Sequence, residues 1–212
     1  LMGYSGLASL GTGGFIGIGT YAVHYIMVEA KLPFLVAVLA AIGVAIIIGL
    51  IVGFISLRIE GIYLVILTLA LSEILRNLYA AVEPKLTLAA KDAVIFGEKF
   101  STKHSLMLVS FFLVVIMIIT SNLINSPTGR AMLAMKNSTA AAQAMGISLI
   151  KYRLMAFVIC TAYAALTGVL LMMVVRSADA TDATGYYALI TSLNILAAVI
   201  IGGFKSIWGA VF

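Results

Sequence analysis

The sequence predicts an all-α protein, a polytopic bundle of transmembrane helices, and three observations lead to this fold class. Of its 212 residues, 63% are hydrophobic and 10% are charged, whereas soluble domains average roughly 45–50% apolar and 25% charged residues. Charge-free apolar runs long enough to cross a bilayer recur along the chain. Backbone polar groups cannot stay unpaired in lipid, so these runs must form helices. This composition excludes a soluble enzyme, a disordered chain and a disulfide scaffold.

About six spans follow, because each span needs about 20 predominantly apolar residues. Five runs carry no formal charge, namely 1–28, 34–57, 105–128, 154–175 and 183–204. A further run, 61–82, carries Glu73, Arg76 and Asn77 in its second half, which is costly in lipid unless that half faces protein or water. We therefore expect one transmembrane domain over residues 1–212, truncated at both ends.

The first run is rich in glycine, and each glycine in a helix costs about 1 kcal/mol relative to alanine. One interpretation is close helix packing, since small residues four positions apart let two backbones approach each other. The pairs with this spacing are Gly13 with Gly17 and Gly49 with Gly53. The other interpretation is a broken glycine-rich helix in which a turn at residues 9–11 lines a polar cavity, as in transporters.

Charge and the reactive residue types exclude several classes of site. Lys and Arg total 13 against 8 Asp and Glu, an excess that in a membrane protein reports loop topology and not nucleic-acid binding. The only cysteine, Cys160, allows no internal disulfide. His24 and His104 have no second metal ligand at helical spacing, so we expect no metal site. No nucleophile–base pair or paired carboxylates indicate catalysis in this chain.

Glu73 and Arg76 are the only ionisable pair well inside an expected span, with Glu73 about 18 Å from the start of its run. Arg76 at i+3 can pair with it. A carboxylate at this depth indicates a functional residue, although a structural ion pair explains it equally well. We expect Thr68 and Ser72 near the same face, where they would add hydroxyls to a polar lining. The candidate residues of a translocation pathway are Ser9, Gly11, Thr68, Ser72, Glu73 and Arg76.

The connection over residues 126–150 is long and basic and contains no acidic residue. Asn137 or Ser138 can cap the start of a short helix over residues 139–145, and Gly146 can end that helix in a left-handed conformation. Its alanine-rich surface would let a partner protein approach closely. The alternative interpretation is an ordinary connector at the membrane interface.

Separate sequence blocks, in a fixed order, cover nearly the whole chain. They are SLG at 9–11 with GIGTY at 17–21, LRIEGIYL at 57–64 with TLA at 68–70 and EILR at 73–76, GRA at 129–131 with AAQAMGI at 141–147, AF at 156–157 and GG at 202–203. Together they resemble the permease subunits of branched-chain amino acid ABC transporters, of the LivM type, with the LivH type as a close relative.

The resemblance implies an ABC importer permease fold in which residues 126–150 form a cytoplasmic coupling loop that docks on the ATPase. The loop is similar to the Glu-Ala-Ala-x-x-x-Gly signature of ABC importers. The residues that the resemblance assigns to ATPase coupling are Arg130, Lys136, Ala140, Ala141, Ala142 and Gly146. Ala140 stands where the signature has glutamate, and residues 84–92 resemble poorly the Thr-Gly-Gly motif expected there.

The resemblance further implies import of branched-chain amino acids across a bacterial inner membrane. Besides membrane lipid, the implied partners are ATP-binding cassette subunits, which would bind ATP and Mg, a second permease subunit, and a periplasmic or surface substrate-binding protein. The chain itself would hold no cofactor. The alternatives are an ABC permease for urea, short amides or a sugar, an ion-driven secondary transporter, and a polytopic membrane enzyme. The loop at 126–150 favours an ATPase-coupled importer, because an ion-driven carrier does not require it.

Overall fold

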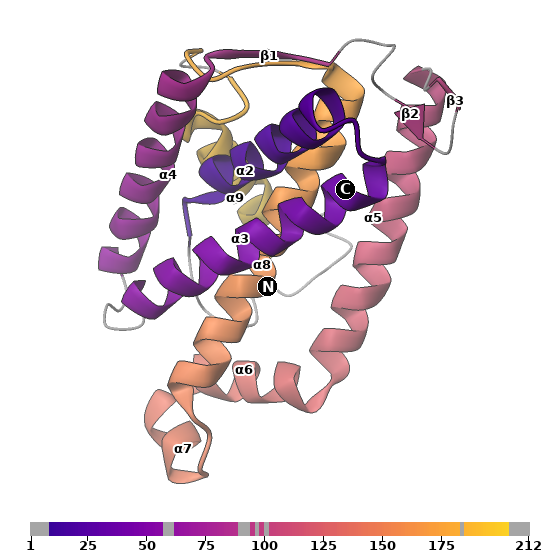
Figure 1. Cartoon of the computed structure of the whole chain (residues 1–212). Coiled ribbons are helices and arrows are strands. Elements are labelled where there is room, and N and C mark those ends of the chain that lie inside the picture. Colours follow the sequence, from indigo (N-terminus) through magenta and orange to yellow (C-terminus); the bar gives the residue numbers. More distant parts are fainter. Residues whose placement is uncertain are drawn as a thin grey trace.

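The computed structural model describes residues 9–56, 62–88, 94–95, 98–99, 102–182 and 185–203 as a helical bundle with short strands at one end (Figure 1). The helices are α2 (Thr12–His24), α3 (Phe34–Ser56), α4 (Ile62–Val82), α5 (Thr102–Asn125), α6 (Pro127–Asn137), α7 (Thr139–Ala144), α8 (Leu149–Val175) and α9 (Leu189–Gly202), and a π-helical turn, η1 (Tyr25–Glu29), continues α2. The strands are β1 (Lys85–Thr87), β2 (Val94–Ile95), β3 (Glu98–Lys99) and β4 (Ser177–Asp179). The all-α prediction is therefore confirmed.

Four of the described helices, α3, α4, α5 and α8, are long and apolar enough to cross a membrane. They match four of the six expected spans. The first and last expected spans correspond to shorter helices, since α2 has 13 residues and α9 has 14. At 1.5 Å per residue each is about 20 Å long, less than the roughly 30 Å of a hydrocarbon core. η1 continues α2 through the end of the first run, and residues 1–8, 183–184 and 204 of the two runs lie outside those described.

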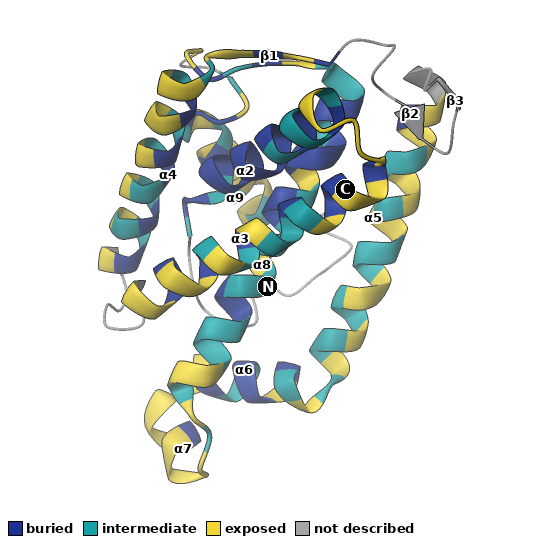
Figure 2. Cartoon of the chain, in the orientation of Figure 1, coloured by how far each residue is buried: buried dark blue, intermediate teal, exposed yellow. Residues whose placement is uncertain are grey.

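α2 occupies the centre of the bundle and packs against α3, α4 and α8 (Figures 1 and 2). All of its residues except Thr12 and Ala22 are buried. A helix that is buried on every side needs no polar face, and small side chains let its neighbours approach its axis. The glycine content of the first run is explained by this position.

α2 and α8 approach each other closely. A Cβ atom on Gly19 would collide with the carbonyl oxygen of Ala165, and a Cβ on Gly168 would collide with the carbonyl oxygen of Ile16. The hydroxyl of Thr20 donates a hydrogen bond to the Gly168 carbonyl at 3.2 Å. The two helices therefore meet backbone to backbone.

The two glycine pairs singled out by their spacing also lie at helix contacts. Side chains or backbone atoms of other segments stand within van der Waals distance of all four positions, or closer. These neighbours are Tyr187 at Gly13, Tyr79 at Gly17, Thr161 at Gly49 and Leu154 at Gly53. Gly49 and Gly53 both face α8, so the close-packing interpretation is confirmed for that pair, whereas Gly13 and Gly17 face two different segments and do not form one helix–helix seam.

A two-stranded antiparallel ribbon joins the connection after α4 to the connection after α8. Lys85 of β1 stands opposite Asp179 of β4, with 3.3 Å between Nζ and Oδ2. Hydrogen bonds from Thr181, and then the neighbouring Lys85, hold the pKa of the Asp179 carboxyl below its ordinary value. The part of the expected Thr-Gly-Gly region at residues 89–92 lies outside the described residues.

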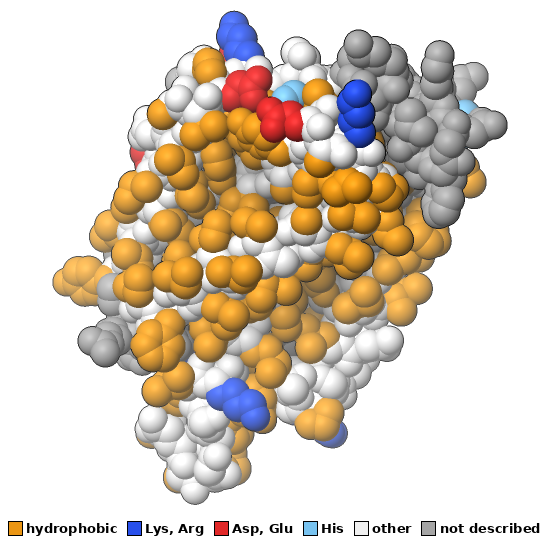
Figure 3. All heavy atoms as spheres, viewed as in Figure 1, with side chains coloured by type: hydrophobic (Ala, Val, Ile, Leu, Met, Phe, Trp, Pro, Cys, Tyr) orange, Lys and Arg blue, Asp and Glu red, His pale blue; other side chains and the backbone are white. Residues whose placement is uncertain are grey.

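The surface has the pattern of a membrane protein. Hydrophobic side chains cover the middle of the face in Figure 3, and charged side chains gather toward its two ends. α5 stands away from the bundle over much of its length (Figure 1), and no residue in its most apolar stretch is buried. The hydroxyl of Thr120 still donates to that of Tyr163 on α8 at 3.2 Å. Apolar side chains so exposed favour contact with lipid.

We expect Gly168→Ala to destabilise the protein and Gly43→Ala not to. The new methyl group at Gly168 would meet backbone that cannot swing aside, and overpacking of this kind costs about 1–3 kcal/mol. Nothing lies within 4 Å of a Cβ at Gly43 of α3, so the second variant should be neutral or slightly stabilising. Thermal unfolding of the two purified variants in detergent measures this difference, and equal melting temperatures would contradict the backbone contact.

Candidate functional site

α2 starts inside the bundle, level with the middle of α4. The amide of Gly14, in its first turn, donates to the hydroxyl of Ser72, which lies midway along α4. The first four N–H groups of any helix lack acceptors within that helix. At this depth neither lipid nor bulk water supplies acceptors, so side chains must do so.

Hydroxyl groups from two other helices cap the start of α2. The Gly13 amide donates to the Oγ of Ser192 on α9, and the Gly14 amide donates to the Oγ of Ser72 on α4, both at 2.9 Å. Gly11, at the N-cap position, has no side chain with which to cap the helix itself. Just before the helix, the Leu10 amide donates to the Oγ1 of Thr68 at 3.1 Å.

Four of the six candidate pathway residues meet at this point. Ser9 accepts a hydrogen bond from the Gly11 amide at 3.3 Å, and Thr68 and Ser72 face the same short segment from α4. Residues 9–11 are non-helical, as expected, while residues 1–8 before them lie outside those described. The hydroxyls of Thr68 and Ser72 are buried and bond to backbone amides.

The expectation that Thr68 and Ser72 share the face of Glu73 is wrong. Neighbouring residues of a helix point about 100° apart, and this separation turns Ser72 toward α2 while the Glu73 side chain remains 41% exposed. The ion pair and the hydroxyl groups therefore lie on different faces of α4.

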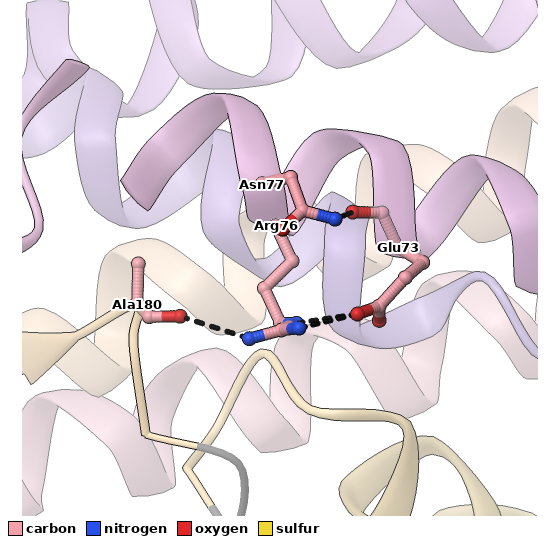
Figure 4. A network of polar contacts seen from close by, with 4 residues as sticks. All are labelled: Glu73, Arg76, Asn77 and Ala180. Atoms are coloured by element: carbon pink, nitrogen blue, oxygen red, sulfur yellow. Dashed lines mark hydrogen bonds and ion pairs between the residues drawn. The ribbon is translucent and has the colours of Figure 1, made fainter. Parts of the chain in front are cut away.

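The predicted ion pair itself is confirmed (Figure 4). Arg76 donates from Nε to the Oε1 of Glu73 at 3.0 Å, and its Nη2 contacts the same oxygen. Its Nη1 donates to the carbonyl of Ala180 at 3.4 Å, and Asn77 donates to the backbone carbonyl of Glu73 at 2.9 Å. Arg76 thereby joins α4 to the segment that leads from β4 to α9.

α2 and α4 run in parallel with one fixed offset. Four hydrogen bonds along the two helices and the residues at their ends join positions 58 apart, namely Leu10 with Thr68, Gly14 with Ser72, Tyr21 with Tyr79 and Tyr25 with Glu83. The Tyr21 and Tyr79 rings stack with centroids 4.6 Å apart. The Tyr79 hydroxyl donates to the Gly14 carbonyl at 2.8 Å. This register fixes the height of α2 within the bundle.

The short helix expected after residue 138 is present as α7. Ser138 caps it by accepting a hydrogen bond from the Ala141 amide at 3.3 Å, and Gly146 ends it with φ of +77°. The Ile147 amide donates back to the Ala142 carbonyl at 3.0 Å, which completes a Schellman motif. The predicted caps are confirmed, with Ser138 and not Asn137 at the N-cap.

The same connection contains a second helix, α6, which sequence reasoning missed. The signal was present, because Ser126 caps α6 and Pro127 occupies its first position, where proline is favoured. Gly129 permits a tight corner after α5, since a Cβ there would collide with the carbonyls of Leu123 and Ile124.

α6 and α7 lie at the end of the bundle opposite the β1–β4 ribbon (Figure 1). A small apolar cluster attaches them to α8, with Met132, Met135 and Ala142 buried against Ala156. The other residues assigned to coupling lie around this cluster and are exposed, namely Arg130, Lys136, Ala140, Ala141 and Gly146. α7 therefore presents its remaining alanines outward (Figure 2).

This fold, with apolar spans around a buried half-length helix, defines a multi-pass membrane protein. Over residues 1–212 the chain matches the family described as branched-chain amino acid transport system / permease component, and it belongs to that family. It is similar to the high-affinity branched-chain amino acid transport system permease protein LivM of Salmonella typhimurium and of Escherichia coli K12. Identity is 30% in both comparisons, over 97% of this chain and 54% of each relative.

The chain thus spans about half the length of the curated relatives that it matches. No solved structure matches it significantly.

We expect Ser72→Ala and Ser192→Ala each to lower stability by about 0.5–2 kcal/mol, the usual cost of losing an N-cap. Each change leaves one buried amide of α2 without its acceptor. Ser110→Ala is the matched control, because this exposed hydroxyl donates only to the Leu106 carbonyl of its own helix. Unfolding of the purified variants in detergent measures the effect; a cost at Ser110 equal to that at Ser72 would refute the capping role.

Proposed function

We propose that this chain is part of the permease subunit of an ATP-driven ABC importer of branched-chain amino acids, in a bacterial inner membrane. The single observation that carries the coupling role is α7, a capped helix that projects its alanines from one end of the bundle. Membership of the family and the names of both LivM relatives support the substrate class.

The partners follow from this role. ATP-binding cassette subunits would bind ATP and Mg and would dock on α7, with Arg130 and Lys136 of α6 beside it. Ala140 and Ala141 are exposed and available for that contact, whereas Ala142 is buried and anchors the helix. A substrate-binding protein would dock at the opposite end, near the β1–β4 ribbon, and a second permease subunit would complete the pathway. This chain would transport and would not itself hydrolyse ATP.

A continuous series of contacts leads from α7 to the start of α2. The apolar cluster joins α6 and α7 to α8 at Ala156. α8 in turn meets the backbone of α2 at Gly168. A push on α7 would move α8 against α2, and α2 depends on Ser72 and Ser192 at its start.

We place the translocation pathway at this start of α2, beside Ser9, Gly11, Thr68 and Ser72. When the capping hydroxyls separate from α2, its freed amides and the positive end of its dipole would suit the carboxylate of an amino acid. Glu73 and Arg76 would border the pathway from α4 by holding the segment that leads to α9.

Uptake of labelled leucine tests the proposal. Vesicles would contain the complete permease with its partner subunits, and urea and ribose, each carrying its own label, would be offered as competitors. ATP-dependent uptake of leucine that neither competitor reduces is expected. ATP-dependent uptake of urea or ribose alone would support an ATP-driven importer but would reject branched-chain amino acids as its substrates. Transport driven by an ion gradient without ATP would indicate a secondary carrier and would reject the ATP-driven importer.

We expect Gly146→Val to uncouple ATP hydrolysis from uptake while the bundle stays folded. A β-branched residue is strained at φ of +77°, so the end of α7 would shift. The space around Gly146 is open, so the strain is confined to the backbone. Gly43→Val on α3 is the control, since a Cβ at that position also meets no neighbour. ATPase and uptake rates measured on the same vesicles give the coupling ratio; an unchanged ratio for Gly146→Val would contradict the coupling role.

A further inference from the structure

The two serines that cap α2 belong to helices that are held to it unequally. α4 carries Ser72; four hydrogen bonds with one offset join it to α2, counted with the residues at the helix ends, and the Tyr21 and Tyr79 rings stack between them. α9 carries Ser192, and among the described residues it forms one hydrogen bond with α2, from the Gly13 amide. Whatever covers the rest of α9, its hold on α2 depends on this single hydrogen bond.

The start of α9 forms one unit with the residues that precede it. The Thr191 hydroxyl, in the first turn of α9, donates to the Gly185 carbonyl at 2.9 Å, and backbone hydrogen bonds within the same turn add to this contact. Residues 185–192 are here called the α9 entry. Of the residues of α9, all of them described, only Ser192 is buried. Tyr187 is also buried, beside α2, so the cap and the tyrosine move together.

Tyr187 is a buried tyrosine whose hydroxyl finds no hydrogen-bond partner among the described residues. Its ring packs on those of Tyr21 and Tyr79, with centroids 6.4 and 6.1 Å away, and both of those hydroxyls donate to backbone carbonyls. Thr20 lies beside Tyr187 but directs its hydroxyl proton to carbonyls of α2 and α8. An unpaired buried hydroxyl raises the free energy of the state that contains it. A state that gives this hydroxyl a partner would therefore be favoured by it.

The connection that leads to the α9 entry is fixed at its other end. The Ala180 amide donates to the Pro84 carbonyl at 2.8 Å, and Arg76 donates to the Ala180 carbonyl at 3.4 Å (Figure 4). Together with the β1–β4 ribbon, these bonds hold residues 177–180 beside the end of α4. Any movement of the α9 entry therefore begins beyond Ala180.

We propose that the α9 entry is the part of the bundle that moves when the pathway opens, and that its withdrawal uncaps Gly13 and exposes the Tyr187 hydroxyl to the substrate. This inference rests on the proposed function, in which capping hydroxyls separate from α2. It assigns the separation to Ser192, while Ser72 stays bonded. The freed Gly13 amide would suit the substrate carboxylate, and the Tyr187 hydroxyl would supply a further hydrogen bond to the substrate.

Of the two caps, Ser192 separates at the lower cost. Its withdrawal breaks one hydrogen bond, whereas separation of Ser72 would require α4 to give up its four hydrogen bonds to α2 and the stacked tyrosine pair. α8 is held as well, because Gly19 and Gly168 leave no side chain between the two backbones that could yield. The main cost of the movement is the burial that the Tyr187 ring gives up, and this burial keeps the α9 entry closed without substrate.

State-dependent cysteine labelling tests which cap separates. In the complete transporter with Cys160→Ser, a single cysteine would replace Ser192 or, as the matched control, Ser72, which caps the neighbouring amide of α2. A charged, membrane-impermeant thiol reagent would be added on the side from which leucine is taken up. We expect Ser192→Cys to be labelled several-fold faster during ATP-driven uptake than at rest, and Ser72→Cys to stay unlabelled in both conditions.

Two labelling results would overturn the proposal, namely equal labelling of both cysteines and no increase at position 192 during uptake. ATP-dependent uptake of leucine by the unaltered transporter is measured first. Its absence would reject the proposed function and the inference with it. Uptake without faster labelling at position 192 would reject the inference alone.

Tyr187→Phe gives a second test that needs no label. Because the hydroxyl has no partner among the described residues, we expect an unchanged or higher melting temperature in detergent. The KM of leucine uptake should rise several-fold with little change in the maximal rate. Tyr79→Phe is the matched control, since it removes a buried hydroxyl that donates to the Gly14 carbonyl at 2.8 Å and should lower the melting temperature. An unchanged KM, or a melting temperature lowered as much as by Tyr79→Phe, would contradict the role of Tyr187.

Discussion

The architecture depends on one requirement, that the amide groups at the start of α2 find acceptors where water is absent. α2 begins at mid-depth, so its first N–H groups would otherwise be unpaired in an apolar interior. Ser72 and Ser192 meet the requirement from two different helices. Hydrogen bonds tolerate only a few tenths of an ångström of displacement, and these two therefore fix α4 and α9 relative to α2.

Glycine makes this arrangement possible by removing side-chain bulk around α2. Because the backbones of α2 and α8 touch at Gly19 and Gly168, a displacement of α8 is transmitted to α2 with no flexible side chain between them. On its other side α2 is joined to α4 by hydrogen bonds at a constant offset, so a displacement of α4 is transmitted to α2 as well. A central helix held by contacts this short moves as a unit with its neighbours or loses its caps.

Local signals predicted much of this molecule, and distant contacts explain what they missed. Charge-free runs located α3, α5 and α8, the apolar run that contains Glu73 and Arg76 located α4, and the capping residues Ser138 and Gly146 located α7. The Glu73–Arg76 pair followed from its i+3 spacing. The role of Ser192 could not be predicted, because its partner Gly13 lies 179 residues away and no local pattern encodes that contact. α6 was missed although Ser126 and Pro127 indicated it.

The two half-length helices also shape the electrostatics of the bundle centre. The first turns of α2 and α9 meet where Ser192 contacts Gly13, so the positive ends of two helix dipoles lie together at mid-depth. Such a pair disfavours cations without any ionisable side chain. The resulting barrier to protons and sodium ions would be built from peptide groups alone, and it would stay constant across the pH range in which carboxylates and histidines titrate.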